Sequence, residues 1–598
     1  MSRSAARDLL GRLTPGLDRL RHYDRGWLRG DVLAGVTVAA YLVPQVMAYA
    51  EIAGLQPVVG LWAISGSLLV YAIVGSSRQL SVGPESTTAL MTAAAIAPLA
   101  AGDPGRYALL AAALALLVGA VCLLAWVARL GFLADLLSKP VLIGYMAGVA
   151  VIMIVGQLGK VSGVDVGGDG VPGEVASFLA HLSQADLPTL SLGLSVLAFL
   201  LVGSRLFPKA PVLLIAVLLA TAAVALLGLQ DNGITVVGAV PEGLPTLQVP
   251  QVTTGDLASL LLPALGVTMV AYTDNVLTAR AFGDRNHYEV DANAELLALG
   301  AANVAAGVVQ GFPVSSSGSR TLIGDSLGSR SQLHSLVALA VVLATLLFLG
   351  PLLAGFPTAA LGAVVIYAAL RLIDVKEFGR IARFRRSELV LALATVVGVL
   401  AAGILYGVLI AVGLSVLDLL RRVARPHDGV LGYAPGIAGM HDIDDYPTAR
   451  QVPGLVVYRY DAPLFFANAA DFKRRALASL SLADGPVEWL IMNMEANIEV
   501  DLTSVDALDQ VRAELERRGV VLALARVKQD LRADLVSSGF LDRVGQERVF
   551  MTLPTAVAAY TDWYTDRHGH GPLARISPAP PSPPPSPPAS PPPSPPAA

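Results

Sequence analysis

The sequence predicts an all-α polytopic membrane protein with a small α/β domain near its C-terminal end. Of its 598 residues, 54% are hydrophobic and only 15% are charged, whereas soluble proteins carry roughly a quarter charged residues. Apolar stretches follow one another from residue 31 to 423, and charged residues return between 455 and 562. We therefore expect a cytoplasmic N-terminal segment (1–30), a transmembrane domain (31–423) and a cytoplasmic domain (424–565).

The apolar stretches are long enough to span a bilayer, because about 20 helical residues cross its hydrocarbon core. The uninterrupted stretches are 107–128, 141–158, 190–204, 210–228, 333–350 and 388–420, the last long enough for two helices. Proline, glycine or polar residues interrupt the stretches 33–53, 84–100, 257–282 and 313–328. Such interruptions are tolerated where the freed polar groups face protein or a water-filled cavity.

Loop charge predicts the orientation, since lysine and arginine concentrate in short cytoplasmic loops. The N-terminal segment is basic, and so are the connections that hold Arg78, Arg129, Lys139, Arg205, Lys209, Arg280, Arg285 and residues 371–386. The segments 161–188 and 229–256 carry acidic residues without lysine or arginine. This alternation places both termini in the cytoplasm.

The C-terminal region alternates predicted strands with predicted helices. LVVYRY, EWLIMNM and VVLALA are typical of buried strands, while SVDALDQVRAELERRG and QDLRADLVSSG are typical of helices. This order indicates an α/β domain with a partly parallel sheet. The final residues are nearly all Pro, Ser and Ala, so we expect residues 566–598 to be a disordered tail.

Two polar interruptions in the first half are candidates for a binding site. In YLVPQVMAY, Pro44 removes a backbone donor and Gln45 places an amide at the same depth. In LSVGPESTTALM, Gly83 and Pro84 are expected to start a helix whose first turn carries hydroxyls. If that helix starts inside the membrane, its free N–H groups and positive dipole end would attract an anion. The alternatives are a harmless kink and a polar helix end at the interface.

The second half contains a matching segment, GFPVSSSGSRTLIGDSLG, with Arg320 in the first turn of a short helix. An arginine at membrane depth is costly and therefore indicates a function; the alternative is a solvated arginine in a cytoplasmic loop. Paired broken segments, one in each half, are typical of transporters built from inverted repeats. Asp274 lies in the middle of another apolar run, and it either couples a proton or sodium or forms a structural pair with an arginine.

These segments resemble those of the sulfate permease superfamily, solute carrier family 26. PQVMAYAEIAGLQPVVGL is similar to the first helix of that family, GPESTTALM to the start of its third and SSSGSRTLIGD to the start of its tenth. Residues 424–565 resemble its sulfate-transporter/anti-sigma-antagonist (STAS) domain. GSSRQLSVGPES, FPVSSSGSRT and PGIAGMHDIDDYP are similar to mycobacterial and other actinobacterial sulfate transporters.

The resemblance implies fourteen helices in two inverted seven-helix repeats, with a core domain that moves against a gate domain. It also implies a homodimer in the bacterial inner membrane that carries a small anion, preferably sulfate, between helices three and ten. The implied substrate-binding residues are Gln45, Tyr49, Glu85, Ser86, Thr87, Ser317, Gly318, Ser319 and Arg320. We expect no cofactor, metal or nucleic-acid partner.

Glu85 departs from the family pattern, which usually has a small or apolar residue at this position. An ionised Glu85 would repel the anion that Arg320 attracts, so anion binding should favour the protonated carboxyl group. We therefore expect Glu85, Asp274 or both to carry the coupling proton. The alternative is that Glu85 pairs permanently with a cation.

The leading interpretation is a proton-coupled anion symporter. A sodium-coupled bicarbonate carrier, a dicarboxylate carrier and an uncoupled exchanger or channel remain open. A sensor or scaffold would gain nothing from inserting these polar groups, and an enzyme is disfavoured because the sequence contains no recognisable metal-ligand cluster, nucleophile–base pair or cofactor loop. In the C-terminal domain, Thr503 and Ser504 are candidates for regulatory phosphorylation, with helix capping as the alternative.

Overall fold

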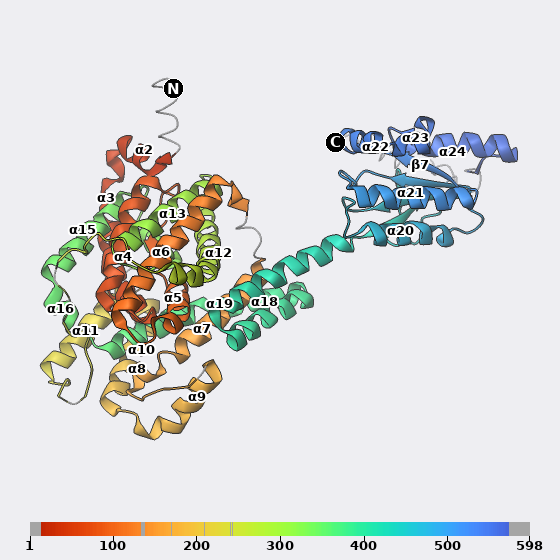
Figure 1. Cartoon of the computed structure of the whole chain (residues 1–598). Helices are drawn as coiled ribbons and strands as arrows, with labels where there is room; N and C mark the ends of the chain where they lie inside the picture. The colour runs from red at the N-terminus through yellow and green to blue at the C-terminus, as the bar shows by residue number, and fades with distance from the viewer. Residues whose placement is uncertain are drawn as a thin grey trace, which may run out of the picture. The chain divides into compact units, whose positions relative to one another are not determined.

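The computed structural model describes residues 13–132, 138–168, 170–207, 210–231, 233–239, 241 and 243–572 (Figure 1). The first twelve residues, Lys209 and the part of the predicted tail from residue 573 onward lie outside the described residues. The chain divides into two compact units, one up to Val416 and one from Leu417. The boundaries expected from the sequence remain predictions.

The first unit is built from helices, and eight of those described are long and apolar enough to cross a membrane. Four shorter helices, α5, α11, α13 and α15, are also apolar. The helices are α2 (Pro15–Arg21), η1 (Arg25–Trp27), α3 (Leu28–Ile52), α4 (Pro57–Val74), α5 (Ser86–Ala100), α6 (Pro104–Val127), α7 (Lys139–Val155), α8 (Leu158–Ser162), α9 (Gly170–His181), η3 (Leu182–Gln184), α10 (Leu187–Leu206), α11 (Val212–Leu226), α12 (Thr254–Arg285), α13 (Ala292–Val308), α14 (Gly318–Ser326), α15 (Leu333–Phe348), α16 (Gly350–Ala354), α17 (Thr358–Leu372), α18 (Val375–Phe384) and α19 (Arg386–Ala424).

The predicted apolar stretches appear as helices, except that 313–328 contains the two-residue strand β2 (Ser315–Ser316) before the short helix α14. The stretch 388–420 forms α19, in which Gly403 has φ 79° and ψ 173°, so two helices meet there as predicted. In contrast, α3 continues through Pro44 without a break, because a proline removes only one donor from an otherwise intact helix. Helices α4, α13 and α17 were not among the predicted spans. The number of fourteen spanning helices and the inverted repeats remain predictions.

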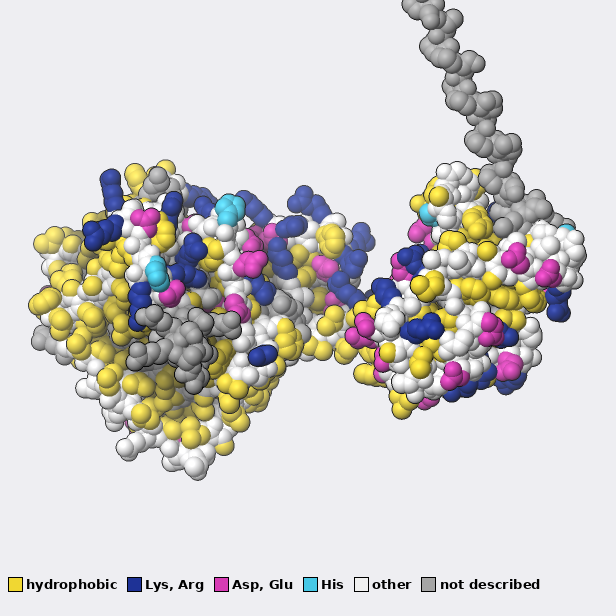
Figure 2. All heavy atoms as spheres, turned by 90° about the horizontal axis from the view of Figure 1, so that it is seen from above, with side chains coloured by type: hydrophobic (Ala, Val, Ile, Leu, Met, Phe, Trp, Pro, Cys, Tyr) yellow, Lys and Arg dark blue, Asp and Glu magenta, His cyan; other side chains and the backbone are white. Residues whose placement is uncertain are grey.

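The helices of the first unit pack in two groups. Helices α4, α6 and α13 pack together, as do α3, α14 and α15, and α12 lies against α5 and α6. In the second group, α17 packs against α7, α8 and α10, and α10 packs against α11. The groups meet where α11 and α17 contact α3. Viewed from the side on which α2 lies, this unit presents lysine and arginine side chains among apolar ones (Figure 2).

Two fully buried carboxylates hold the loops of the first unit in place. Glu295 accepts hydrogen bonds from the Tyr71 hydroxyl (2.9 Å), the Ser77 N–H (3.2 Å) and the Asn275 side chain (2.7 Å). Asp31 accepts from the N–H of Arg330 (2.8 Å), among other donors. Since both oxygens of each carboxylate are used, the cost of burying the charge is offset by charge-assisted hydrogen bonds.

The second unit contains a six-stranded mixed sheet with the strand order β4-β3-β5-β6-β7-β8. Strands β5 to β8 are parallel, and β3 pairs antiparallel with both β4 and β5. This confirms the predicted α/β domain. The elements are β3 (Asp428–Tyr433), β4 (Met440–Asp442), β5 (Leu455–Tyr460), α20 (Ala469–Ala478), η4 (Ser479–Leu482), β6 (Trp489–Asn493), α21 (Leu502–Arg517), β7 (Val521–Ala525), α22 (Gln529–Ser537), α23 (Phe540–Val544), η5 (Gln546–Arg548), β8 (Val549–Phe550) and α24 (Leu553–His568).

Each face of this sheet has its own apolar core. Alternate strand residues such as Val456 and Tyr458 pack with α20, α21, α22 and α23. Their neighbours Leu455 and Val457 point to the opposite face and pack with α24. The period of two along each strand thus places helices on both faces. Helix α24 extends to His568, into the start of the predicted tail.

Candidate anion-binding site

The two interrupted segments identified in the sequence meet in the structure. Strand β1 (Val82–Gly83) pairs antiparallel with β2 (Ser315–Ser316), and each strand leads into a helix, α5 or α14. The Ser317 N–H donates to the Ser81 carbonyl at 3.0 Å, and the Ser81 N–H donates to Thr321 Oγ1 at 3.0 Å. The starts of α5 and α14 are therefore joined by main-chain hydrogen bonds.

Helix α5 begins later than the sequence predicted. Gly83 and Pro84 precede the helix because Gly83 pairs with Ser315 in the short sheet. Glu85 is the N-cap residue of α5 in an extended conformation, and its carboxylate accepts hydrogen bonds from the Thr87 N–H (2.7 Å) and the Ser86 hydroxyl.

Helix α14 is capped by a hydroxyl. Ser317 is its N-cap residue, and the Ser317 Oγ atom accepts from the N–H of Arg320 at 3.5 Å. Gly318 is exposed, and a Cβ atom added there would have no other atom within 4 Å. The start of α14 therefore faces open space, as an anion at a helix N-terminus requires.

Arg320 is fully buried and is hydrogen-bonded to two segments of the first half, α3 and the segment around β1. Its Nη1 atom donates to the Pro84 carbonyl at 2.9 Å and to Gln45 Oε1 at 3.3 Å, and Nε donates to Ser81 Oγ at 3.3 Å. Its Nη2 atom has no hydrogen-bond partner among the described residues. A buried guanidinium with neutral acceptors and an unused donor is suited to bind an anion.

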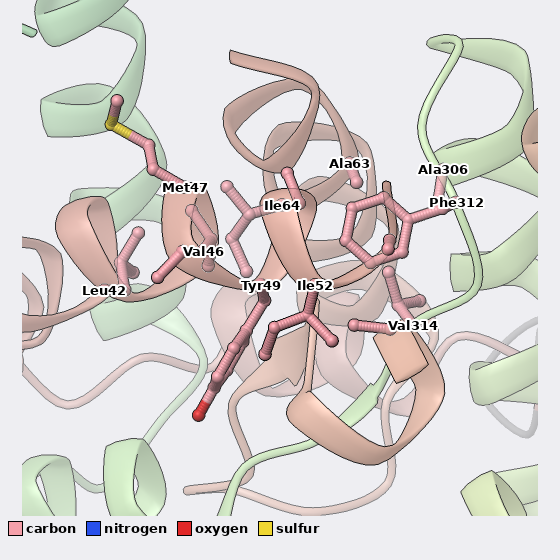
Figure 3. Close-up of a cluster of buried hydrophobic side chains, with 14 of the residues drawn as sticks. Leu42, Val46, Met47, Tyr49, Ile52, Ala63, Ile64, Ala306, Phe312 and Val314 are labelled. Carbon is pink, nitrogen blue, oxygen red and sulfur yellow. The ribbon is translucent and has the colours of Figure 1, made fainter. Parts of the chain in front are cut away.

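Helix α3 presents Gln45 and Tyr49 to the same site. Gln45 Nε2 donates to the Tyr49 hydroxyl at 2.9 Å, while its Oε1 atom accepts from Arg320. Apolar side chains from α3, α4 and the segment before β2 form a cluster around Ile64 and Phe312. The Tyr49 hydroxyl points away from this cluster (Figure 3). Apolar packing therefore positions the helix that carries both polar groups.

Asp274, in the middle of α12, lies beside the short sheet. Its Oδ2 atom accepts a hydrogen bond from Ser316 Oγ at 3.0 Å, and its carboxylate interacts electrostatically with Glu85. Arg320 donates to Ser81, Gln45 and Pro84 instead. The described contacts of Asp274 therefore include no arginine, in contrast to the structural Asp–Arg pair considered from the sequence.

A cavity of about 370 Å³ adjoins the start of α14. One wall contains Tyr41 of α3 and Ser319 of α14, and the other is formed by α10, α11 and α17. Tyr367 and Arg371 of α17 line this second wall, and Arg371 Nη1 donates to the Tyr367 hydroxyl at 3.0 Å. The cavity lies between the two groups of helices and reaches Ser319.

Thr503 and Ser504 belong to the second unit, at the start of α21. The N-cap residue of α21 is Asp501, whose carboxylate accepts from the Ser504 N–H at 2.8 Å. Thr503 is exposed and Ser504 is buried. The cap of α21 is therefore the carboxylate of the neighbouring Asp501, while a regulatory role for either hydroxyl remains a prediction.

Three residues that shape the site were not selected from the sequence. Ser81 bonds Arg320, and Tyr41 lines the cavity; both lie within or beside the quoted polar segments. Asn303 of α13 holds Val314 through two hydrogen bonds, from Nδ2 to the carbonyl (3.0 Å) and from the Val314 N–H to Oδ1 (2.9 Å). The sequence did contain an indication of this role, because an asparagine inside an apolar helix usually has a buried hydrogen-bond partner.

A mostly helical first unit with a polar site at two joined helix starts, followed by an α/β domain, defines a class of multi-pass membrane transport proteins. A model of the sulfate permease family matches residues 28–395, and a model of the STAS domain matches residues 446–556. The chain belongs to the sulfate permease family and carries a C-terminal STAS domain.

Similar proteins include a probable sulfate transporter of Mycobacterium tuberculosis, 61% identical over 91% of this chain and 98% of that protein. Probable sulfate transporter 4.2 of Arabidopsis thaliana is 32% identical over 88% of this chain and 80% of its own. The fold is similar to that of the murine solute carrier 26 family member A9 anion transporter in the inward-facing state, with a TM-score of 0.85 at 22% identity, covering 94% of this chain and 95% of that one.

Proposed function

We propose that this protein is a secondary transporter that imports sulfate, with the anion held between the N-termini of α5 and α14. The observation that carries the proposal is Arg320, which is buried beside both helix starts and whose Nη2 atom has no partner among the described residues. Sulfate is a compact dianion, and two helix ends with a guanidinium supply charge-assisted donors for its oxygens. The names of the similar proteins support sulfate as the substrate.

Movement of the site would follow the division into two groups of helices. Helices α3, α5 and α14 carry the site and would act as the core, while α10, α11 and α17 would act as the gate. The main-chain bonds between β1 and β2 favour movement of the two helix starts as one body. This supports elevator-like alternating access, in which the cavity beside Ser319 is the route to one side.

Coupling to protons is assigned to Glu85 and Asp274. Glu85 caps α5 and Asp274 accepts a hydrogen bond from Ser316 of β2, so a proton on either carboxyl group would reduce the negative charge near a bound sulfate. A sodium ion is the alternative, because carboxylate and hydroxyl oxygens can also coordinate a hard cation.

The protein would lie in the inner membrane with both termini in the cytoplasm. The basic loops and the arginine and lysine side chains on the α2 side support this orientation. The cavity lined by Arg371 would then open toward the cytoplasm. Assembly as a homodimer is also proposed.

The test is uptake of labelled sulfate by liposomes that contain the purified protein. We expect accumulation under an inward proton gradient, none without a gradient, and loss in Arg320→Ala that elutes like the wild type in gel filtration. Absence of sulfate uptake, combined with bicarbonate uptake under a sodium gradient, would overturn the proposal. Unlabelled bicarbonate and dicarboxylates serve as competitors.

A further inference from the structure

Three metal-ligand side chains converge at the beginning of the second unit. His427, Asp442 and Asp445 each offer one ligand atom, and these atoms all lie within 4.8 Å of one another. His427 precedes β3, and Asp442 ends β4, which pairs antiparallel with β3. The hairpin therefore brings His427 to the HDIDDYP part of the PGIAGMHDIDDYP segment, a proximity that the sequence analysis did not identify.

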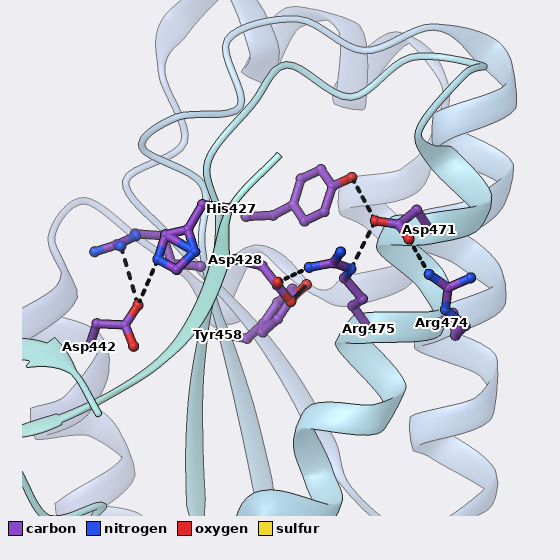
Figure 4. Close-up of polar contacts among 9 residues, drawn as sticks. His427, Asp428, Asp442, Tyr458, Asp471, Arg474 and Arg475 are labelled. Atoms are coloured by element: carbon purple, nitrogen blue, oxygen red, sulfur yellow. Dashed lines mark hydrogen bonds and ion pairs between the residues drawn. The ribbon is translucent and has the colours of Figure 1, made fainter. Parts of the chain in front are cut away.

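Asp442 is the central residue of this cluster, and its side chain is only 2% exposed. Its Oδ1 atom accepts from the Asp444 N–H at 3.0 Å, whereas Oδ2 accepts no hydrogen bond from any described residue. Two nitrogen atoms lie near Oδ2 without donating a hydrogen bond to it: His427 Nε2 at 3.5 Å and Arg459 Nη2 at 3.6 Å (Figure 4). A buried carboxylate oxygen without a donor is costly, which indicates a missing partner.

Asp428, in the same hairpin, has a carboxylate with both a hydrogen-bond donor and a cationic partner. It accepts from the Tyr458 hydroxyl at 2.8 Å and is paired with Arg475 (Figure 4). Asp471 is likewise paired with Arg474 and Arg475. Asp442 therefore stands out among the acidic residues of this region.

Two features near Asp442 favour a bound cation: open space beside its carboxylate and negative charge that is not neutralised. A Cβ atom added to Gly429 would lie 1.9 Å from Asp442 Oδ2, so only glycine leaves this position open to the carboxylate. The charge of Arg459 is offset by Asp461, whose Oδ1 atom lies 2.7 Å from Arg459 Nε. The remaining charges of Asp442 and Asp445 match a divalent ion.

We infer that His427, Asp442 and Asp445 bind a divalent transition metal ion such as zinc. Zinc is bound by imidazole nitrogen and carboxylate oxygen at about 2.0–2.2 Å, which places neighbouring tetrahedral ligands about 3.3 Å apart. The 3.5 Å between His427 Nε2 and Asp442 Oδ2 is close to that separation. Asp445 is exposed and can rotate toward the ion, and water would complete the coordination. The ion would tie the segment after α19 to the β3–β4 hairpin.

The experiment uses the full-length protein in detergent, without an affinity tag and stripped of metal by a chelator. Titration with zinc chloride, followed by calorimetry, is expected to show one equivalent of tight binding, and zinc is expected to raise the thermal midpoint of the protein. Substitution of cobalt for zinc should give the visible absorption bands of a tetrahedral site. His427→Ala and Asp445→Asn should each weaken zinc binding by about tenfold or more.

Matched controls come from the same segment. His441→Ala and Asp444→Asn remove a neighbouring imidazole and a neighbouring carboxylate that are outside the cluster, and they should bind zinc like the wild type. His568→Ala tests a second exposed histidine, which lies 2.9 Å from Glu488. Because His427 and Asp445 are exposed, their variants should fold normally. The inference is wrong if the wild type binds no stoichiometric zinc, or if both cluster variants bind it as tightly as the controls do.

Discussion

Arg320 shows how a single charged residue can be accommodated in the interior of a helical membrane protein. Its acceptors are a serine hydroxyl, a glutamine amide and a proline carbonyl. None of these carries a formal charge, so the positive charge of Arg320 is available to a ligand. The planar fork divides these bonds between Nη1 and Nε and keeps Nη2 for a further acceptor, which a single lysine ammonium group cannot do.

Arg320→Lys is therefore expected to reduce sulfate uptake strongly although the charge is retained. A single ammonium group cannot reach Ser81, Gln45 and Pro84 together, and we expect a loss of about tenfold or more, equivalent to at least one charge-assisted hydrogen bond. Initial rates in liposomes measure this. Arg330→Lys, on an exposed side chain, is the control; wild-type rates in Arg320→Lys would contradict the role assigned to the fork.

The pH dependence of uptake should depend on Glu85 and Asp274. In the wild type, uptake should rise as the external pH falls, because protons drive import and neutralise the carboxylates beside the anion. Glu85→Gln or Asp274→Asn mimics the protonated state, so the variant that removes the coupling group should show a flat pH profile. If both variants keep the wild-type pH profile, neither carboxyl group carries the coupling proton.

At the scale of elements, close helix contacts depend on glycine. Gly60 of α4 faces α3 so closely that an added Cβ atom would lie 2.0 Å from the Val46 carbonyl oxygen. Small residues of this kind allow helix backbones to approach each other in membranes. The contact matters for function because Gln45 and Tyr49 lie on the same helix as Val46.

Gly60→Ala is expected to lower the thermal midpoint of the detergent-solubilised protein, since backbone atoms cannot move aside as a flexible side chain can. The cost should be about 1–3 kcal/mol, the range for overpacking. Gly379→Ala in the exposed helix α18 is the matched control, because no atom lies within 4 Å of the added Cβ. There the midpoint should stay the same or rise. Equal effects at both positions would argue against close packing of α3 on α4.

A second link between elements joins the two groups of helices. Lys160 of α8 lies 2.9 Å from Glu51 of α3, and the pair is partly exposed. If the groups move against each other, this ion pair must break during transport. Lys160→Glu or Glu51→Lys should therefore alter uptake rates by up to about fivefold, since such a pair contributes at most about 1 kcal/mol. The double exchange should restore the rate; additive effects of the two changes would indicate no coupling.

Helices were predictable from the sequence where apolar residues were continuous, as in α6 and α11. Helices α4, α13 and α17 were not selected, and α13 contains Glu295 and Asn303, whose partners lie elsewhere in the chain. The residues of the candidate site were predictable from their types. The pairing of β1 with β2 was not, because two-residue strands have no recognisable period and lie far apart in the sequence.

At the scale of the whole molecule, the two units have separate cores. The second unit buries apolar side chains on both faces of its own sheet. Three of its strands, β5, β6 and β7, were predicted, with LVVYRY forming β5 (Leu455–Tyr460), whereas β3, β4 and β8 were not. Local apolar patterns were enough to predict those three strands, because each strand is formed by contiguous residues. The metal-ligand cluster depends instead on the hairpin register and could not be read from spacing.

A fragment comprising residues 424–572 is expected to fold by itself. It should be soluble, show a mixed helix and strand circular dichroism spectrum, and unfold in one cooperative thermal transition, as single domains of this size do. Leu524→Asp, at a fully buried strand position, should abolish that transition, whereas Leu482→Asp at an exposed position should not. A fragment without cooperative unfolding would show that its cores depend on the first unit.

The contacts of Arg320 also have a consequence for biosynthesis. Every side chain or carbonyl that accepts a hydrogen bond from its guanidinium precedes it in the chain, with Pro84 lying 236 positions earlier. At about 5–20 residues per second, the ribosome needs on the order of 10–50 s to make that interval. All three acceptors are thus synthesised well before the arginine emerges, so this costly charge can be inserted directly beside groups that accept its hydrogen bonds.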